Sequence, residues 1–121
     1  MNTQELLKVV KSALEDIKAK DIKVLDVSRI SNFTDMMVIA SGQSNRQIKA
    51  LADRVIEQAK AHGHRPLGSE GQNSGEWVLV DLGNIVVHMM QPQTRDFYQL
   101  EKLWEDMHTV PSDNFKLAET V

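Results

Sequence analysis

Cysteine is absent from this chain of 121 residues. Its absence excludes disulfide bridges, thiolate metal sites and a cysteine nucleophile. Because disulfides persist mainly in oxidising compartments, a chain without cysteine also favours an intracellular address.

An excess of basic residues is also missing. The 17 acidic and 14 basic residues give a formal net charge of −3 and a pI near 5.8. Proteins that grip nucleic acid usually carry a basic surface, because phosphate contacts dominate their affinity. The chain is therefore not expected to bind nucleic acid sequence-specifically. A mildly acidic protein better suits a basic protein partner or a small cation.

Long apolar runs are missing as well. Residues 1–5 are polar, and charged residues interrupt the apolar pattern that follows, so no export signal is evident. No run is long enough to span a bilayer. We therefore expect a cytoplasmic protein without membrane contact, and its length is that of one domain with a single core.

The apolar residues that are present predict eight elements in the order α-β-β-α-β-β-β-α. Three- and four-residue spacing indicates helices over residues 2–18 and from Ser44 to Gly63. Both begin with a capping-box pattern, Asn2 with Glu5 and Ser44 with Gln47. Short apolar runs predict strands at 22–27, 36–40, 65–70, 77–80 and 85–90.

The C-terminal part of the chain predicts one more helix and a tail. Gln93 or Thr94 is expected to cap this helix, whose apolar stripe favours a core position. The members of the stripe are Phe97, Leu100, Trp104 and Met107. Residues 109–121 have weak periodicity and are predicted to form a C-terminal tail to a domain of residues 1–108.

These elements predict the fold class α/β (α+β), a single domain with a mixed β-sheet of four to five strands flanked by helices. The run at residues 36–40 is continuously apolar, which is typical of a central strand buried on both faces.

The last two strands form a predicted β-hairpin whose two faces differ. The turn residues 81–84 include a glycine and an asparagine, which tolerate the positive φ of a tight turn. Because side chains alternate across a strand, one face is almost purely aliphatic. The other face mixes apolar and polar groups: Trp77, Leu79, Asp81, Val86, His88 and Met90. That face is either a core face with a few paired polar groups or an open surface for a partner.

Catalytic constellations are weak in this sequence. Asp81 and His88 share a face of the hairpin, with Ser41, Ser44 or Ser74 as the candidate nucleophile. Separately, Asp35 with Asp81 resembles a carboxylate pair for magnesium. Asp35 and Asp81 are interpreted more simply as turn or capping residues, and Arg95 as a neighbour that pairs with one of them. Other patterns are weaker still. The loop at 41–44 lacks the glycines and lysine of a phosphate loop, and the histidines at 62 and 64 lack a third ligand. No cofactor, metal or catalytic residue is expected.

Several motifs together resemble the ribosomal silencing factor family, RsfS, also called Iojap. The match covers the chain from the first helix to residue 104. The motifs that carry it are DMMVIASGQSNRQ at residues 35–47, Glu70-Gly71, Trp77, Asp81, Gly83, Val87-His88, and RDFYQLEKLW at residues 95–104.

The resemblance implies a protein that binds ribosomal protein L14 (uL14) on the large ribosomal subunit. Bound there it blocks joining of the small subunit and represses translation under nutrient limitation or in stationary phase. It also implies a nucleotidyltransferase-like topology without catalysis and a homodimer in the free protein. The alternatives are a large-subunit assembly factor and a small nucleotidyltransferase-like enzyme.

The resemblance also favours the open-surface interpretation of the mixed hairpin face. An aromatic anchor with an apolar surround and a few polar groups is typical of a protein interface. The residues expected to bind L14 are Trp77, Leu79, Asp81, His88 and Met90.

Overall fold

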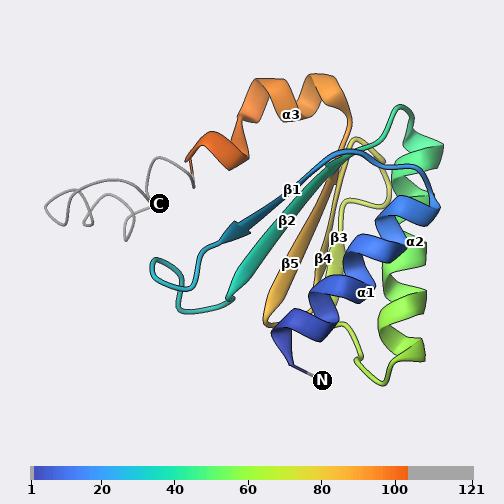
Figure 1. Cartoon of the computed structure of the whole chain (residues 1–121). Coiled ribbons are helices and arrows are strands. Elements are labelled where there is room, and N and C mark those ends of the chain that lie inside the picture. Colours follow the sequence, from blue (N-terminus) through green and yellow to red (C-terminus); the bar gives the residue numbers. More distant parts are fainter. Residues whose placement is uncertain (1, 104–121) are drawn as a thin grey trace, which may run out of the picture.

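The computed structural model describes residues 2–103, which form the predicted order of helices and strands. Figure 1 shows a sheet with two long helices on one side and a short helix over the other. The elements of the described part are α1 Thr3–Asp16, β1 Lys20–Asp26, β2 Met36–Ser41, α2 Asn45–Ala61, β3 Gly68–Glu70, β4 Trp77–Asp81, β5 Ile85–Met90 and α3 Pro92–Tyr98.

The sheet of the described residues has five strands in the order β1-β2-β5-β4-β3. Strands β2 and β5 run parallel, and the other neighbours are antiparallel, so the sheet is mixed as predicted. Strand β2 lies in the interior of the sheet, and five of its six residues are buried. The fold class predicted from the sequence, a single α+β domain with a mixed sheet and flanking helices, is therefore confirmed.

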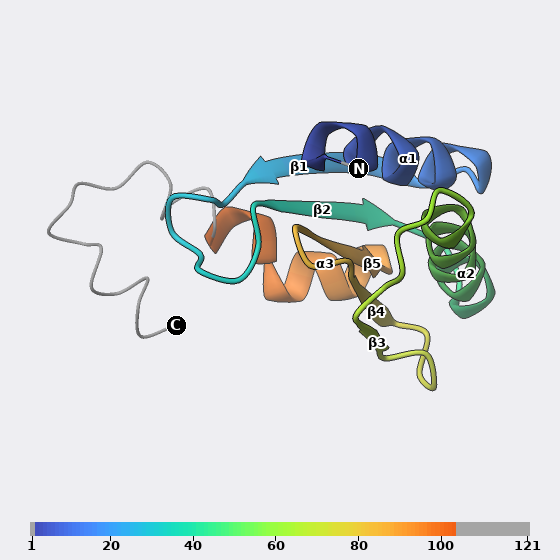
Figure 2. The same cartoon turned by 90° about the horizontal axis from the view of Figure 1, so that it is seen from below.

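Helices α1 and α2 cover one face of the sheet, as Figure 2 shows from below. Their apolar stripes pack on the aliphatic face of the hairpin, and this layer is the main core. Each large aliphatic side chain buried there contributes about 1.5–3 kcal/mol. Fully buried members of this core include Leu6, Leu14, Ile48, Leu51, Ile85 and Met89.

Both predicted capping boxes begin their helices. The side chain of Asn2 accepts a hydrogen bond from the backbone N–H of Glu5 (2.8 Å), and Ser44 accepts from the N–H of Gln47 (3.1 Å). These bonds satisfy donors that the first turn of a helix leaves free. None of the helices within residues 2–103 combines the length and the apolar character needed to cross a membrane.

The hairpin closes through a two-residue turn at Gly83 and Asn84. The N–H of Leu82 donates to the carbonyl of Ile85 (2.8 Å), and Gly83 has a φ of +89°. Glycine at the first central position is what a tight hairpin turn of this kind requires. Asp81 accepts from the N–H of Gly83 (2.8 Å), which confirms its interpretation as a turn residue.

Helix α3 differs from the sequence prediction at both ends. It begins at Pro92 with Gln91 as its N-cap, so the predicted caps Gln93 and Thr94 are wrong. Proline fits the first helical position because its missing N–H has no partner there. Residues 100–103 are again helical.

A break in this helix explains the second error. Gln99 takes the left-handed conformation (φ 47°) and ends α3 after Tyr98. The predicted core position of Phe97 is therefore wrong, since its side chain is 80% exposed, whereas Leu100 packs against the sheet as predicted. Trp104, Met107 and residues 109–121 lie outside the described residues.

Candidate partner-binding surface

The second face of the sheet carries the mixed residues of the hairpin. Strand register places His88 beside Leu79 and Ile39, and Met90 beside Trp77. A small apolar cluster lies under this face, separate from the main core. It consists of Val27, Met37, Ile39 and Met90, with Leu25, Ile30, Trp77 and Leu100 packed against it. Helix α3 and residues 100–103 lie over this face near the C-terminal ends of β2 and β5 (Figure 1).

Trp77 is half-buried, with one edge tied into the sheet. Its indole Nε1–H donates to Nδ1 of His88 at 3.0 Å, and the two ring centroids are 5.9 Å apart. Tryptophan needs a partner for its N–H when that edge is buried, and here His88 supplies it. The hydrogen bond fixes the ring while leaving part of it accessible.

His88 is 5% exposed, and its Nδ1 is the buried acceptor of the Trp77 indole N–H. Burial lowers the pKa of His88 from 6.5 to about 4, because the charged imidazolium is poorly solvated inside the sheet face. The ring is therefore neutral at physiological pH. Since Nδ1 accepts from Trp77, the proton of the neutral ring is on Nε2.

An aromatic strip continues from Trp77 onto α3; we define it as Trp77, Tyr98 and Phe97. The Trp77 and Tyr98 centroids are 5.0 Å apart at a tilt of 51°, and Tyr98 contacts Phe97 edge-on, also at 5.0 Å. Both α3 rings are exposed. Exposed aromatic rings that contact one another mark a surface suited to a partner.

The other predicted contact residues occupy different depths. Leu79 and Asp81 are half-buried, and the Asp81 carboxylate caps the hairpin turn. Met90 is 0% exposed and lies in the small apolar cluster. In this arrangement Trp77, Leu79 and Asp81 reach the surface, and His88 and Met90 support it from beneath. Direct contact of these residues with L14 stays a prediction.

Arg95 holds α3 against the end of the sheet. Its Nη1 donates to the hydroxyl of Ser41 (2.8 Å) and to the backbone carbonyl of Asp21 (2.7 Å). Its Nε and Nη2 both contact Oε2 of Glu101, at 2.8 and 2.6 Å, and both side chains of this ion pair are largely buried. Helix α3 itself has no buried residue, so this polar anchor is a main attachment of the helix.

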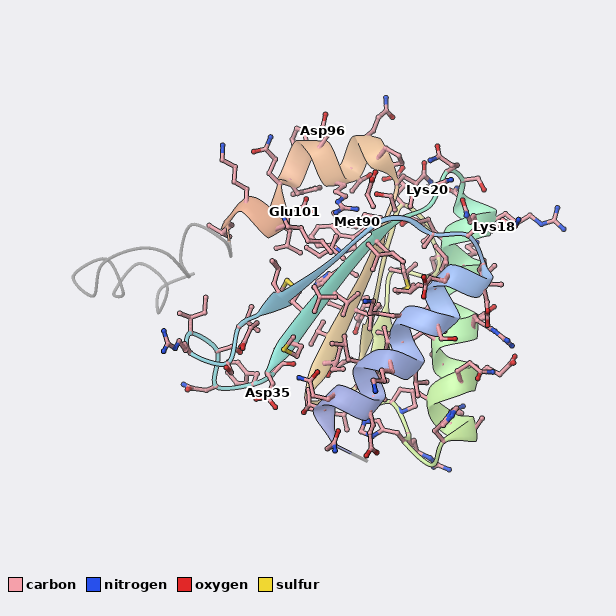
Figure 3. All side chains as sticks on the ribbon, viewed as in Figure 1. Lys18, Lys20, Asp35, Met90, Asp96 and Glu101 are labelled. Atoms are coloured by element: carbon pink, nitrogen blue, oxygen red, sulfur yellow. The ribbon has the colours of Figure 1, made fainter. Side chains whose placement is uncertain are left out.

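The predicted pairing of Arg95 with Asp35 or Asp81 is therefore wrong. Figure 3 shows Asp35 at one end of the sheet, with Met90 and Glu101 at the other, where α3 lies. Parallel pairing of β2 with β5 places Ser41 beside Met90, at the end from which α3 departs. Arg95 is thus a full sheet length away from both aspartates.

The groups considered for catalysis do not converge. Asp35 accepts a hydrogen bond from the Thr3 hydroxyl (3.4 Å) at the end of the sheet opposite Ser41. His88 Nδ1 accepts from Trp77, while Asp81 caps a turn. Within residues 2–103 no three histidine or acidic side chains group in a way that could hold a metal ion.

A polar cleft of about 640 Å³ lies between α3 and the sheet, and Ser41, Arg95 and Glu101 are among its lining residues. Within this set, the Arg95 guanidinium bonds to both the Ser41 hydroxyl and the Glu101 carboxylate. The charges of Arg95 and Glu101 therefore offset each other in the wall of this cleft.

Sequence reasoning missed the exposed position of Phe97 and Tyr98. Adjacent residues on a helix point about 100° apart, so two bulky rings side by side seldom both lie at the centre of one core stripe. That spacing favours a surface position for at least one of the two rings.

Comparison with known proteins decides the family. The family described as "Ribosomal silencing factor during starvation" matches residues 1–121. The chain belongs to the ribosomal silencing factor family. A ribosomal silencing factor RsfS of Chromobacterium violaceum is 52% identical over 104 residues, which are 86% of this chain and 85% of that protein.

Structures and more distant members agree with this assignment. A crystal structure of a Chromobacterium violaceum protein superposes with a TM-score of 0.85 at 51% identity, covering 87% of this chain and 88% of the other. A mouse protein named mitochondrial assembly of ribosomal large subunit protein 1 is 36% identical over 77% of this chain and 42% of its own length. This chain thus also matches a protein much longer than itself.

Proposed function

We propose that this silencing factor binds ribosomal protein uL14 on the large ribosomal subunit and blocks association with the small subunit. By doing so it represses translation in the cytoplasm under nutrient limitation or in stationary phase. Membership of the ribosomal silencing factor family supports a ribosomal partner. The aromatic strip on the second sheet face supports the place of contact.

The observation that carries the proposal is the state of Trp77. The ring is held by His88 at 3.0 Å and by Tyr98, yet part of it stays accessible. A pre-positioned aromatic side chain loses little conformational freedom on binding, which is what an interface anchor requires. Leu79 and Asp81 beside it supply an apolar neighbour and a carboxylate.

The proposed mechanism is steric. This protein and the small subunit cannot occupy the same surface of the large subunit. A small protein bound there therefore prevents joining without changing the shape of the ribosome. Its potency then follows its affinity for uL14. The net charge of −3 suits a basic ribosomal protein, because opposite fields speed encounter.

Sedimentation tests this proposal directly. Purified large and small subunits are mixed with and without the protein, under conditions in which the subunits otherwise join. We expect the protein to co-migrate with the large subunit alone and the joined peak to decrease. Co-migration with the small subunit, or an unchanged joined peak, would refute the proposal.

A second candidate function is assembly of the large subunit, favoured by the name of the mouse relative. It would use the same uL14 contact at a different time. Deletion of the gene separates the two. Loss of an assembly factor leaves incomplete large subunits during rapid growth. Loss of a silencing factor leaves the large subunits complete and alters translation only when nutrients are short.

We further propose that the protein is not an enzyme, and that the free protein forms a homodimer. The separation of Ser41 from Asp35 and Asp81 by the length of a strand supports the first part. Thermal unfolding with nucleotides and magnesium tests it, since a bound ligand raises the melting temperature. Sedimentation equilibrium of the free protein tests the dimer.

A further inference from the structure

A shallow groove of about 280 Å³ borders the aromatic strip where β4 begins. It lies next to the Trp77 surface and includes one face of α3. The residues that line it are Glu76, Gln91, Gln93, Thr94, Phe97 and Tyr98.

Two exposed rings form the apolar part of this groove. Phe97 is 80% exposed and contacts Tyr98 edge-on at 5.0 Å, and Tyr98 in turn packs on Trp77. The position of the rings is set by Arg95, which ties α3 to the sheet. Ring faces carry negative electrostatic potential, which attracts cations.

Glu76 supplies the one charged side chain among these lining residues. It is exposed, and its carboxylate has no ion-pair partner within residues 2–103. Its backbone carbonyl accepts from the N–H of Gln91 (2.9 Å), so the start of β4 is joined to the start of α3. The backbone of Glu76 is thereby fixed at the groove that Phe97 and Tyr98 also line, and its carboxylate is exposed there.

The combination fits a positively charged side chain. An ammonium or guanidinium group gains from the ring faces and from the carboxylate, and the neutral amide and hydroxyl groups of the groove accept its remaining hydrogen bonds. A phosphate group would be repelled by Glu76. The groove chemistry therefore favours a basic protein over ribosomal RNA.

We propose that this groove receives a lysine or arginine side chain of the ribosomal protein bound by the Trp77 surface. The inference rests on the proposed function and extends the contact from β4 onto α3. Glu76 and Phe97 are then specificity residues that select a basic partner.

The test compares two groove variants with two matched controls. Glu76→Gln removes the charge with little change of shape, and Phe97→Leu removes the ring but keeps an apolar side chain. The controls make the same changes elsewhere. Glu15→Gln is at an exposed position of α1, and Phe33→Leu is in the loop before β2, where Phe33 is 92% exposed. Affinity for purified large subunits is measured at low and at high potassium chloride, after circular dichroism has shown that each variant is folded.

We expect each groove variant to bind about three- to tenfold more weakly at low salt, the range of a cation–π or exposed charge contact. Glu76→Gln should also bind with a smaller salt dependence than the wild type, because the lost contact is electrostatic. The two control variants should bind like the wild type.

Two results would overturn the inference while leaving the proposed function intact. In the first, the wild type binds and both groove variants match it in affinity and salt dependence. In the second, Glu76→Gln binds more tightly, which would place RNA phosphate at the groove. Failure of the wild type itself to bind large subunits would instead overturn the proposed function, and the inference with it.

Discussion

His88 makes the stability of this protein depend on pH in a calculable way. Its pKa is 6.5 in an unfolded chain and about 4 in the folded protein. Between these values the unfolded chain binds more protons than the folded protein, so the free energy of unfolding falls as the pH falls. The contribution of His88 is therefore fully present above pH 6.5 and is lost as the pH approaches 4.

The size of the effect follows from the pKa difference. One pKa unit corresponds to about 1.4 kcal/mol, so the full loss is about 3 kcal/mol. Between pH 7 and pH 5 the expected loss is about 2 kcal/mol. Protonation also removes the acceptor of the Trp77 N–H at 3.0 Å, so the same step loosens the ring that is proposed to contact uL14.

Urea unfolding at a series of pH values measures this loss. The matched variant is His88→Asn, because an asparagine oxygen near the position of Nδ1 still accepts from Trp77 and does not titrate. The variant has its own stability, but its free energy of unfolding should fall about 2 kcal/mol less than that of the wild type between pH 7 and pH 5. Parallel curves for the two proteins would refute the assignment of a low pKa to His88.

Three further predictions concern the fold that supports the surface. Arg95→Ala should lower the free energy of unfolding by about 2 kcal/mol, because it leaves the largely buried Glu101 without its partner, and urea denaturation measures this. Gly71→Ala should lower the free energy of unfolding by about 3 kcal/mol or more, since a Cβ there would lie 2.0 Å from the Trp77 carbonyl oxygen at a φ of +93°. Gly83→Ala should lower it by about 1 kcal/mol, because φ is similar (+89°) but a Cβ there has more space. Equal melting temperatures for these two glycine variants would contradict the steric argument. Removal of residues 109–121 should leave the melting temperature and subunit binding unchanged, as the boundary proposed after residue 108 requires, and a lowered melting temperature would place that boundary too early.

Local patterns in the sequence were sufficient for most of the fold. Alternation along residues 77–90 correctly separated the aliphatic face from the mixed face of the hairpin. The capping boxes at Asn2 and Ser44 were also correct, because each hydrogen bond joins residues three positions apart in the chain. Such features depend on the neighbouring chain alone.

The errors arose from contacts between distant segments and from one unusual backbone conformation. The partner of Arg95 depends on which strand ends are adjacent, and the parallel pairing of β2 with β5 decides that. The exposure of Phe97 depends on the left-handed Gln99, a residue type with no strong preference for that conformation. The candidate surface was predicted from the hairpin, but its extension onto α3 required the structure.

The most direct test of the central claim is calorimetric titration of purified uL14 with wild-type protein, Trp77→Ala and Phe33→Ala. Phe33 is 92% exposed in the loop before β2, at the end of the strands away from Trp77, and is the matched control. We expect Trp77→Ala to remain folded and to lose about 2 kcal/mol of binding free energy or more, roughly thirtyfold in affinity, while Phe33→Ala binds like the wild type. Equal affinity of a folded Trp77→Ala variant and the wild type would contradict the claim that the Trp77 surface binds uL14.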